Sequence, residues 1–277
     1  MRVLLIGDIV GKPGLKIVRR AVPLLRKREK LDFVVANGEN AADGSGITPG
    51  IYAKLIAAEV DCITLGDHIY RRQEISETLA KERNILKPAN FPPGAPGRGW
   101  TVLKAKNGVE VAVISLLGRV FMRPVDCPWQ AVEKVLAEIP PEVKVKLVDF
   151  HAEATSDKQV MGRYLDGRVS AVVGTHTHVP TADEGVFPGG TAFQCDLGMT
   201  GPFESILGRR IDRVTETTVT FQPTHFEVAT EDVRLCGAII EIDDQTGRAV
   251  SIRRVMVKEE ILASWETIPT PATPPLM

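Results

Sequence analysis

The sequence predicts an α/β fold, on three observations. Short apolar runs alternate with longer helical patterns through the first two thirds of the 277 residues, an order typical of sheets covered by helices. The final third is richer in strand-like runs, which predicts a second sheet with some antiparallel pairing, packed on the first. Polar residues follow directly after several predicted strands, and ligands bind at that edge of an α/β sheet.

The first two thirds alternate predicted strands with predicted helices. The apolar runs that we interpret as strands are residues 2–6, 33–36, 62–65, 146–150 and 171–173. The helical patterns are residues 14–30, 49–60, 73–83, 129–139 and 156–165. Pro49 suits the first turn of a helix. Pro23 lies inside the first pattern, so we expect that helix to kink or restart there.

The remaining strand signals lie in the middle and at the end of the chain. Asn107 and Gly108 form a strong hairpin signal between residues 100–104 and 109–115. The later candidate strands are residues 193–195, 217–221, 235–242 and 250–257. The last two are joined by the turn-rich sequence DDQTGR.

Composition favours one globular domain over residues 1–262, followed by a Pro-rich, disordered tail over 263–277. No run of about 18 apolar residues predicts a membrane span, and the first residues do not resemble a signal peptide. The four cysteines are far apart, so we expect reduced thiols and a cytoplasmic location. A formal net charge of −1 argues against broad binding to duplex nucleic acid, but not against a small phosphate substrate.

Five strand-end loops supply carboxylate, amide or imidazole groups, and they hold four of the five histidines. The candidates are Asp8, Glu39, Asn40, Asp67, His68, His151, Glu153, His176 and His178. Each alone has a structural interpretation, such as a helix cap, a turn or a hydrogen-bonded histidine. A purely structural role is harder to accept for the pair His176 and His178. Alternate residues of a strand share a face, and imidazoles fill cores poorly. Their convergence at one edge favours a site.

The ligand types indicate the chemistry. Carboxylate, amide and imidazole groups without thiolate suit Mn, Fe or Zn better than a structural zinc site. The ligands suffice for two ions, and a carboxylate such as Glu39 can bridge them. Two ions roughly 3.5–4 Å apart can clamp the attacking and leaving oxygens in phosphoryl transfer. We therefore expect His176 and His178 to bind different ions of one pair.

At these residues the sequence resembles the calcineurin-like metallophosphoesterases, and more narrowly the YmdB-like bacterial family, which hydrolyses 2′,3′-cyclic nucleotides. The matching stretches occur in order up to about residue 202: LLIGDIVGKPG, NGENAADGSGIT, TLGDH, KPANFPPGAPGRG, LLGRVFM, DFHAEATSDK, VVGTHTHVPTAD and DLGMTGP. Broader metallophosphoesterases usually carry Asp-x-His where this chain has Asp8-Ile-Val. The YmdB-like family lacks that histidine, and the asparagine that takes its place is Asn40 here.

The resemblance implies a four-layer α/β/β/α sandwich, a homo-oligomer and two metal ions. Fe or Mn is expected, with Zn or Mg as alternatives. One ion would be held by Asp8, Glu39, Asn40 and His178. The other would be held by Glu39, Asp67, His151 and His176. His68 would be the acid that protonates the leaving oxygen.

Residue 67 departs from the family, whose motif is Gly-Asn-His where this chain has Gly-Asp-His. Asp67 can still ligate through oxygen. Its extra negative charge should favour a more highly charged ion, such as ferric iron, and make bound water less acidic.

The predicted function is a dinuclear phosphodiesterase for small phosphodiesters, 2′,3′-cyclic nucleotides or RNA ends that carry a cyclic phosphate. A metal-bridging hydroxide would attack phosphorus in line, and His68 would donate a proton to the departing ribose oxygen. A phosphomonoesterase or a 3′,5′-cyclic nucleotide phosphodiesterase on the same metals is the alternative within enzymes. A regulatory protein that keeps the metals and binds a nucleotide or RNA end without turnover is the alternative from another class.

Further residues are candidates for supporting roles. Asn90 is a candidate substrate contact, although a turn before two prolines explains it equally well. Asp149 and Glu153 are candidates to orient a ligating imidazole. The arginines that could contact phosphate, although such residues are commonly solvated, are Arg71, Arg72, Arg119 and Arg123.

Overall fold

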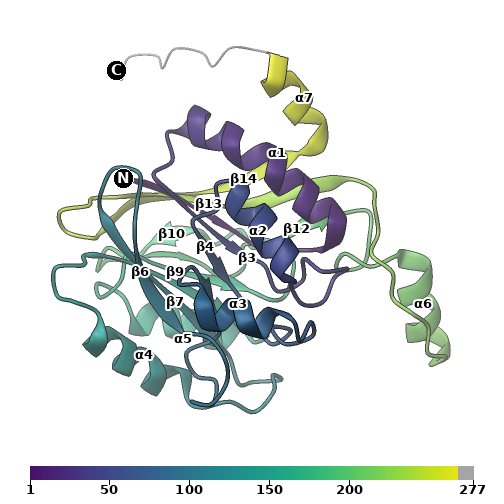
Figure 1. Ribbon diagram of the computed structural model, residues 1–277, viewed down its shortest axis with the longest axis horizontal. Coiled ribbons are helices and arrows are strands. Elements are labelled where there is room, and N and C mark those ends of the chain that lie inside the picture. Colours follow the sequence, from purple (N-terminus) through teal and green to yellow (C-terminus); the bar gives the residue numbers. More distant parts are fainter. Residues whose placement is uncertain (268–277) are drawn as a thin grey trace.

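Two β-sheets form the centre of the protein (Figure 1). The structure is a computed structural model that describes residues 1–267. The first sheet has the order β2-β12-β13-β1-β3-β4-β5, with β14 also paired to β13. Its strands are β1 (Arg2–Ile6), β2 (Asp8–Ile9), β3 (Phe33–Asn37), β4 (Cys62–Thr64), β5 (Ile85–Leu86), β12 (Met199–Pro202), β13 (Val233–Ile242) and β14 (Ala249–Lys258).

The second sheet has the order β10-β11-β9-β8-β7-β6. Its strands are β6 (Trp100–Lys104), β7 (Glu110–Leu117), β8 (Val145–His151), β9 (Ala171–Thr175), β10 (Gly185–Val186) and β11 (Ala192–Gln194). The predicted hairpin around Asn107 and Gly108 is confirmed, because β6 and β7 pair antiparallel on either side of it. Gly108 has a φ of +88°, a conformation that glycine adopts readily.

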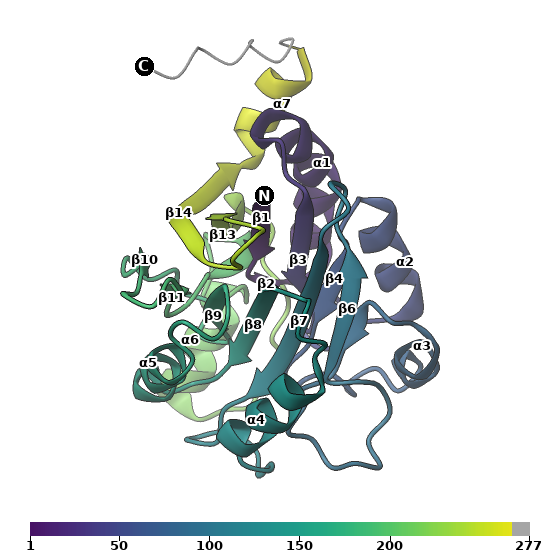
Figure 2. The same ribbon diagram turned by 90° about the vertical axis from the view of Figure 1, so that its left-hand side faces the viewer.

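Seven helices are assigned within residues 1–267. They are α1 (Gly11–Glu29), α2 (Pro49–Ala57), α3 (Ile75–Lys81), α4 (Pro128–Glu138), α5 (Thr155–Tyr164), α6 (Ile211–Thr220) and α7 (Glu259–Thr267). Helices α1, α2 and α3 cover the first sheet, while α4 and α5 lie on the opposite side of the molecule (Figure 2). None of the helices in this part of the chain is long and apolar enough to cross a membrane.

Three buried apolar clusters hold these layers together, and they follow the alternation of side chains along the strands. Leu4 of β1 packs under α1, whereas its neighbour Leu5 faces the second sheet. In β8, Leu147 faces the first sheet and Val148 faces α4 and α5. The order of layers is therefore helix, sheet, sheet, helix, and the four-layer α/β/β/α sandwich is confirmed.

The assignment of strands to sheets differs from the sequence prediction. Strand β13 pairs with β1 antiparallel, with Leu4 opposite Ile239, so the hairpin of β13 and β14 belongs to the first sheet. Strands β8 and β9 instead form the middle of the second sheet. Nearly all of β13 is buried, so it needs cover on both faces, and a position beside β1 provides it.

Three local predictions also differ, in whole or in part. Residues 217–221 were interpreted as a strand because β-branched residues dominate there, but Ile211–Thr220 is a helix that projects from the body of the protein (Figure 1). Intrinsic strand preference is weak where no neighbouring strand is present to pair. Of the two outcomes expected at Pro23, a kink or a restart, the restart does not occur, because α1 continues through this residue. The predicted tail begins inside α7, which extends to Thr267, and residues 268–277 lie outside the described residues.

Candidate metal centre

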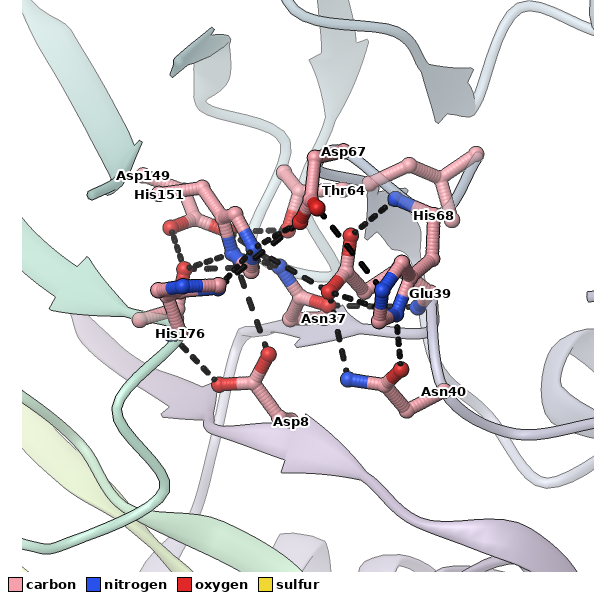
Figure 3. Close-up of polar contacts among 12 residues, drawn as sticks. Asp8, Asn37, Glu39, Asn40, Thr64, Asp67, His68, Asp149, His151 and His176 are labelled. Carbon is pink, nitrogen blue, oxygen red and sulfur yellow. Dashed lines mark hydrogen bonds and ion pairs between the residues drawn. The ribbon is translucent and has the colours of Figure 1, made fainter. Parts of the chain in front are cut away.

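The predicted ligands converge at one place, although they come from two sheets rather than one. Asp8 begins β2, Glu39 and Asn40 follow β3, and Asp67 follows β4, all in the first sheet. His151 ends β8, and the two histidines of GTHTH follow β9 in the second sheet. The strands β1, β3 and β4 are mutually parallel, and so are β7, β8 and β9. The site lies where the carboxyl ends of both sets of strands face each other (Figure 3).

One group of four side chains has the spacing of a metal site. Ligand atoms of Glu39, Asp67, His151 and His176 all lie within 4.8 Å of one another. His151 Nε2 is central to the group. It lies 3.0 Å from Glu39 Oε1, 3.3 Å from Asp67 Oδ1 and 3.0 Å from His176 Nδ1. These residues match one of the two ligand sets implied by the resemblance.

The second predicted set adjoins the first through Glu39. Asn40 Nδ2 lies 3.1 Å from Glu39 Oε1 and 3.2 Å from His178 Nε2. His178 Nε2 in turn lies 4.0 Å from Asp8 Oδ1. Glu39 is therefore the carboxylate common to both groups, as a bridging ligand must be.

The two histidines of GTHTH reach different neighbours because they lie beyond the strand. Strand β9 ends at Thr175, and His176 and His178 have φ values of +102° and +67°. The expectation that they share one strand face was therefore wrong, since these left-handed conformations turn the loop. His176 contacts His151 and Glu153, whereas His178 contacts Asn40 and places Nδ1 3.1 Å from the carbonyl oxygen of Leu207.

A buried hydrogen-bond chain orients His151. Thr175 Oγ1 donates to Asp149 Oδ1 at 2.7 Å, so it can only accept from His151 Nδ1, which lies 2.8 Å away. Asp149 also accepts bonds from Thr64 and Asn37. Fixing the proton of His151 on Nδ1 directs Nε2 at the ligand cluster, as ligating histidines require. Asp149 thus orients the imidazole, as predicted, but it acts through Thr175.

Three carboxylates of the site are partly or fully buried, and their pKa values depend on the nearby histidines. Burial raises the pKa of Asp8 to about 6, against the lowering effect of His178 and His151. Burial also opposes ionisation of Glu39, but the charge and hydrogen bond of His151 outweigh it and lower the pKa of Glu39. Conversely, Glu39 and Asp67 outweigh the effect of burial on His151 and raise its pKa well above the usual value. Without a metal ion, the imidazolium of His151 thus supplies positive charge to the three carboxylates, and a bound cation would take the place of its Nε2 proton.

Two further observations test whether metal ions fit these residues. Asp8 Oδ1 is buried and has no hydrogen-bond partner among residues 1–267, and a buried carboxylate oxygen needs one. At Gly66, a Cβ atom would lie 2.4 Å from Glu39 Oε2 and 2.2 Å from His151 Cδ2. Only glycine allows the backbone to pass so close to both ligands. The donor set, the orphaned oxygen and this close approach all fit metal ions.

His68 lies at the open side of the cluster. Its Nδ1 lies 2.8 Å from Asn40 Oδ1, and its backbone N–H donates to Glu39 Oε2 at 3.1 Å. Its Nε2 lies 3.7 Å from Asp67 Oδ2, and the side chain is 30% exposed. Because a carbonyl oxygen has two lone pairs, Asn40 can accept from His68 and still offer one to an ion.

Sequence reasoning missed an anchor beneath the histidine loop. The carboxylate of Asp196 accepts hydrogen bonds from the backbone N–H and the hydroxyl of Thr177, the residue between the two histidines. Lys158 donates to the same carboxylate from α5. Both residues lie in stretches that match the family, DFHAEATSDK and DLGMTGP, but only the fold brings them to this loop.

Of the residues predicted to have supporting roles, some contact the candidate ligands and others do not. Glu153 Oε2 lies 3.1 Å from His176 Nε2, as expected of a residue that orients an imidazole. Asn90 is not brought into the cluster, because its amide bonds to the backbone of Leu117 and Asp126.

Three of the four candidate arginines likewise contact the chain itself. Arg72 lies 3.4 Å from the carbonyl oxygen of Ala42 and from the carboxylate of Asp43. The guanidinium of Arg119 lies over the ring of Trp129, and that of Arg123 lies over Phe91.

This sandwich, with carboxylates and imidazoles where its two sheets face each other, is the architecture of a metallophosphoesterase-type protein. More narrowly, the chain belongs to the YmdB-like protein family, whose model matches residues 4–255.

Known relatives agree with this assignment. The 2′,3′-cyclic-nucleotide 2′-phosphodiesterase of Bacillus subtilis (strain 168) is 46% identical over 94% of this chain and 98% of its own. A hypothetical protein from Thermus thermophilus has a crystal structure with a TM-score of 0.88 and 40% identity, over 94% of this chain and all of its own. A phosphatase from Mycoplasma pneumoniae has a TM-score of 0.87 and 27% identity, over 93% of both chains.

Proposed function

We propose that the protein is a metal-dependent phosphodiesterase that opens 2′,3′-cyclic nucleotides. The observation that carries the proposal is Glu39, whose carboxylate lies in both groups of candidate ligands. The broader class, a phosphoric diester hydrolase, is supported by the Bacillus subtilis relative, whose name gives that activity. Fe and Mn are the ions we propose, with Zn or Mg as alternatives.

The proposed ligands divide between two ions. Asp8, Glu39, Asn40 and His178 would hold one, and Glu39, Asp67, His151 and His176 would hold the other. When bound, such ions supply positive charge to the phosphoryl oxygens and make a water molecule more acidic.

The remaining steps fall to side chains of the protein. His68 is the proposed general acid, because Asn40 fixes its Nδ1 and leaves Nε2 at the open side of the cluster. Water loses a proton to solvent as its oxygen adds to phosphorus, the bond from phosphorus to one ribose oxygen breaks, and the Nε2 proton of His68 passes to that oxygen. His68 then regains a proton from solvent. The product is a phosphomonoester. Asp149 and Thr175 keep the imidazole of His151 in its ligating orientation throughout.

A phosphomonoesterase is the second candidate, because the Mycoplasma pneumoniae neighbour is described as a phosphatase. The metal-loaded protein should be tested on 2′,3′-cyclic AMP, 3′,5′-cyclic AMP and adenosine 3′-monophosphate. We expect turnover of the first substrate. Turnover of the monophosphate alone favours the phosphomonoesterase, and binding without turnover favours a regulatory protein.

The two-metal assignment has its own test. Glu39→Ala should lose both ions and nearly all activity, because one carboxylate serves both. The control is Glu77→Ala, the same change at an exposed carboxylate on α3. Full metal occupancy of Glu39→Ala by elemental analysis contradicts the assignment. The homo-oligomer and the cytoplasmic location stay predictions, and light scattering tests the first.

A further inference from the structure

We propose that the loop between β7 and α4, residues 118–127, is a binding site for the nucleobase of the substrate, with Phe121 as its stacking surface. The inference rests on the proposed function in one respect, that the substrate carries a base next to the reacting phosphate. The base belongs either to a free cyclic nucleotide or to the end of an RNA chain.

The loop begins beside a proposed metal ligand. Strand β7 pairs in parallel with β8, and its last residue, Leu117, lies opposite His151. The next residue, Gly118, donates its backbone N–H to the carbonyl oxygen of His151 at 2.9 Å. Phe121 is three residues further on, so its Cα lies within about 11 Å of Gly118 even if the chain is fully extended. That is about the span of one nucleotide.

The other side of the loop lies toward the segment that follows His68. The guanidinium of Arg123 lies 5.6 Å from the ring centroid of Phe91, and that ring lies 6.3 Å from the ring of Tyr70, two residues after His68. Met122 and Val125 pack against the large apolar cluster of the first sheet. The loop therefore runs from β7, the strand beside the one that carries His151, toward the segment that follows His68. We expect it to border the open side of the cluster, where His68 is partly exposed.

Asn90 fixes both ends of this loop. Its amide donates to the carbonyl oxygens of Leu117 and Asp126, at 2.8 and 2.9 Å, and its oxygen accepts from the N–H of Leu117. Asn90 is only 1% exposed, so these bonds are sheltered from water. The residue that the sequence predicted as a substrate contact thus holds the loop in place.

Phe121 is turned away from the protein, in contrast to its neighbour Met122. Its side chain is 89% exposed, and its φ is +59°, a conformation that bulky residues rarely adopt. Backbone strain of this kind persists where the surrounding structure holds it, and it is concentrated at functional sites. Here the fixed loop ends hold it, and the strain presents an aromatic ring to solvent.

The chemistry of the loop suits a nucleotide. An exposed aromatic ring stacks on any base, because every base has a π face. Arg119 and Arg123, both exposed, flank the ring at two residues on either side. Each guanidinium lies over an aromatic ring of the protein, at 5.8 Å for Trp129 and 5.6 Å for Phe91. Cations placed in this way attract phosphate next to the stacked base.

The test compares substrates with and without a base. We expect Phe121→Ala to lower kcat/KM for 2′,3′-cyclic AMP by about 5- to 100-fold, mainly through KM. Methyl riboside 2′,3′-cyclic phosphate, which lacks a base, should be unaffected. Phe121→Trp should retain the preference, and Phe221→Ala is the matched control, because Phe221 is as exposed as Phe121, has the same φ and lies outside the loop. An equal loss on both substrates overturns the proposal, and so does the absence of any loss on both of them and on an RNA end that carries a cyclic phosphate.

A binding experiment separates this proposal from the proposed function. Calorimetry on metal-loaded protein compares adenosine 3′-monophosphate with methyl riboside 3-phosphate, so no turnover is needed. If the adenosine compound binds more tightly and Phe121→Ala removes the preference, the nucleobase site stands even where no cyclic phosphate is hydrolysed. If wild-type protein shows no preference, the nucleobase site is wrong whatever the activity.

Two further arms identify the source of the base and the main rival occupant. A trinucleotide ending in a 2′,3′-cyclic phosphate should lose as much with Phe121→Ala as 2′,3′-cyclic AMP does if the terminal base stacks. A loss confined to the trinucleotide supports the site and assigns it to RNA. If Phe121→Ala changes the oligomer in light scattering and leaves the base preference intact, Phe121 contacts a second copy of the chain and the proposal fails.

Discussion

Lys158 and Asp196 form an ion pair inside the protein. The Nζ atom lies 2.7 Å from Oδ2, and the two side chains are 2% and 1% exposed. The same oxygen accepts hydrogen bonds from the backbone N–H and the hydroxyl of Thr177. Helix α5, which carries Lys158, is thereby connected through Asp196 to Thr177, the residue between His176 and His178. The ion pair thereby holds this loop in place, although His176 and His178 have positive φ values that are unfavourable for residues other than glycine.

We expect Lys158→Met to lower the free energy of unfolding by about 3–5 kcal/mol, because it leaves the buried carboxylate of Asp196 without its cation. Lys158→Met combined with Asp196→Asn should recover part of that loss, since no charge is then buried and the amide oxygen still accepts from Thr177. Urea unfolding of the three proteins measures both effects. A double variant that is less stable than Lys158→Met would contradict the expected coupling.

Asp8 should cost stability when no metal is bound and provide it when metal is present. Its pKa is raised from 3.8 to about 6 by burial, so ionised Asp8 disfavours the folded state by roughly 3 kcal/mol. Because the pKa of this carboxyl group is higher in the folded state, its ionisation lowers the free energy of unfolding. This loss is complete above pH 6 and disappears as the pH falls below 4. Asp8→Asn should therefore stabilise the metal-free protein at pH 8, by on the order of 1–3 kcal/mol, and have little effect near pH 4.

With metal ions added, the sign of this effect should reverse, because the variant loses a ligand and ligand binding stabilises the folded state. Thermal unfolding of both proteins, with chelator and with Mn²⁺, gives the comparison. Equal stabilisation of both proteins by Mn²⁺ would mean that Asp8 is not a ligand.

His68→Ala should retain both metal ions and lose turnover by about 10²–10⁴-fold on 2′,3′-cyclic AMP, the usual contribution of a general acid. The loss should be smaller on a p-nitrophenyl phosphodiester, because p-nitrophenolate leaves without needing a proton. Steady-state kinetics on both substrates, with metal content checked by elemental analysis, provide the measurement. An equal loss on the two substrates would instead indicate that His68 positions the phosphate.

Asp67→Asn restores the amide typical of the family. Burial opposes ionisation of Asp67, but the hydrogen bond and charge of His151 outweigh it and hold the pKa of Asp67 below its ordinary value. The proposed ligand Asp67 is thus charged, and its charge would disfavour ionisation of a metal-bound water molecule. The variant's pH–rate profile should have its acidic limb at lower pH when both proteins carry the same divalent ion. An unchanged or higher limb would show that Asp67 does not ligate or that its charge is neutralised.

Much of the fold could be predicted because its signals are local. The strands at residues 2–6 and 33–36, and the hairpin around Asn107 and Gly108, follow from apolar runs and turn chemistry that neighbours in the sequence specify. The strand predicted at residues 217–221 was wrong because that prediction also used local signals alone. Their β-branched side chains favour a strand, but no strand within residues 1–267 lies beside them to pair, and a helix forms instead.

The candidate site was predictable as a set of residues but not as an arrangement. Chemical type and position after strands marked Asp8, Glu39, His151 and the GTHTH histidines, since metal ligands are few and polar residues at strand ends are conspicuous. The supporting residues Thr175 and Asp196 were not marked, because a threonine or an aspartate has many structural uses. Their roles follow only from which atoms they meet.

The sequence by itself determined the α/β alternation, the order of the elements and the chemical inventory of the site, because these depend on residues close together along the chain. Only the tertiary structure decided that β13 pairs with β1, that the ligands come from two facing sheets, and that Asn90 clamps a loop. Such contacts join residues far apart in the chain. They are selected by the joint burial of whole faces and the pairing of buried polar groups, which no local pattern records.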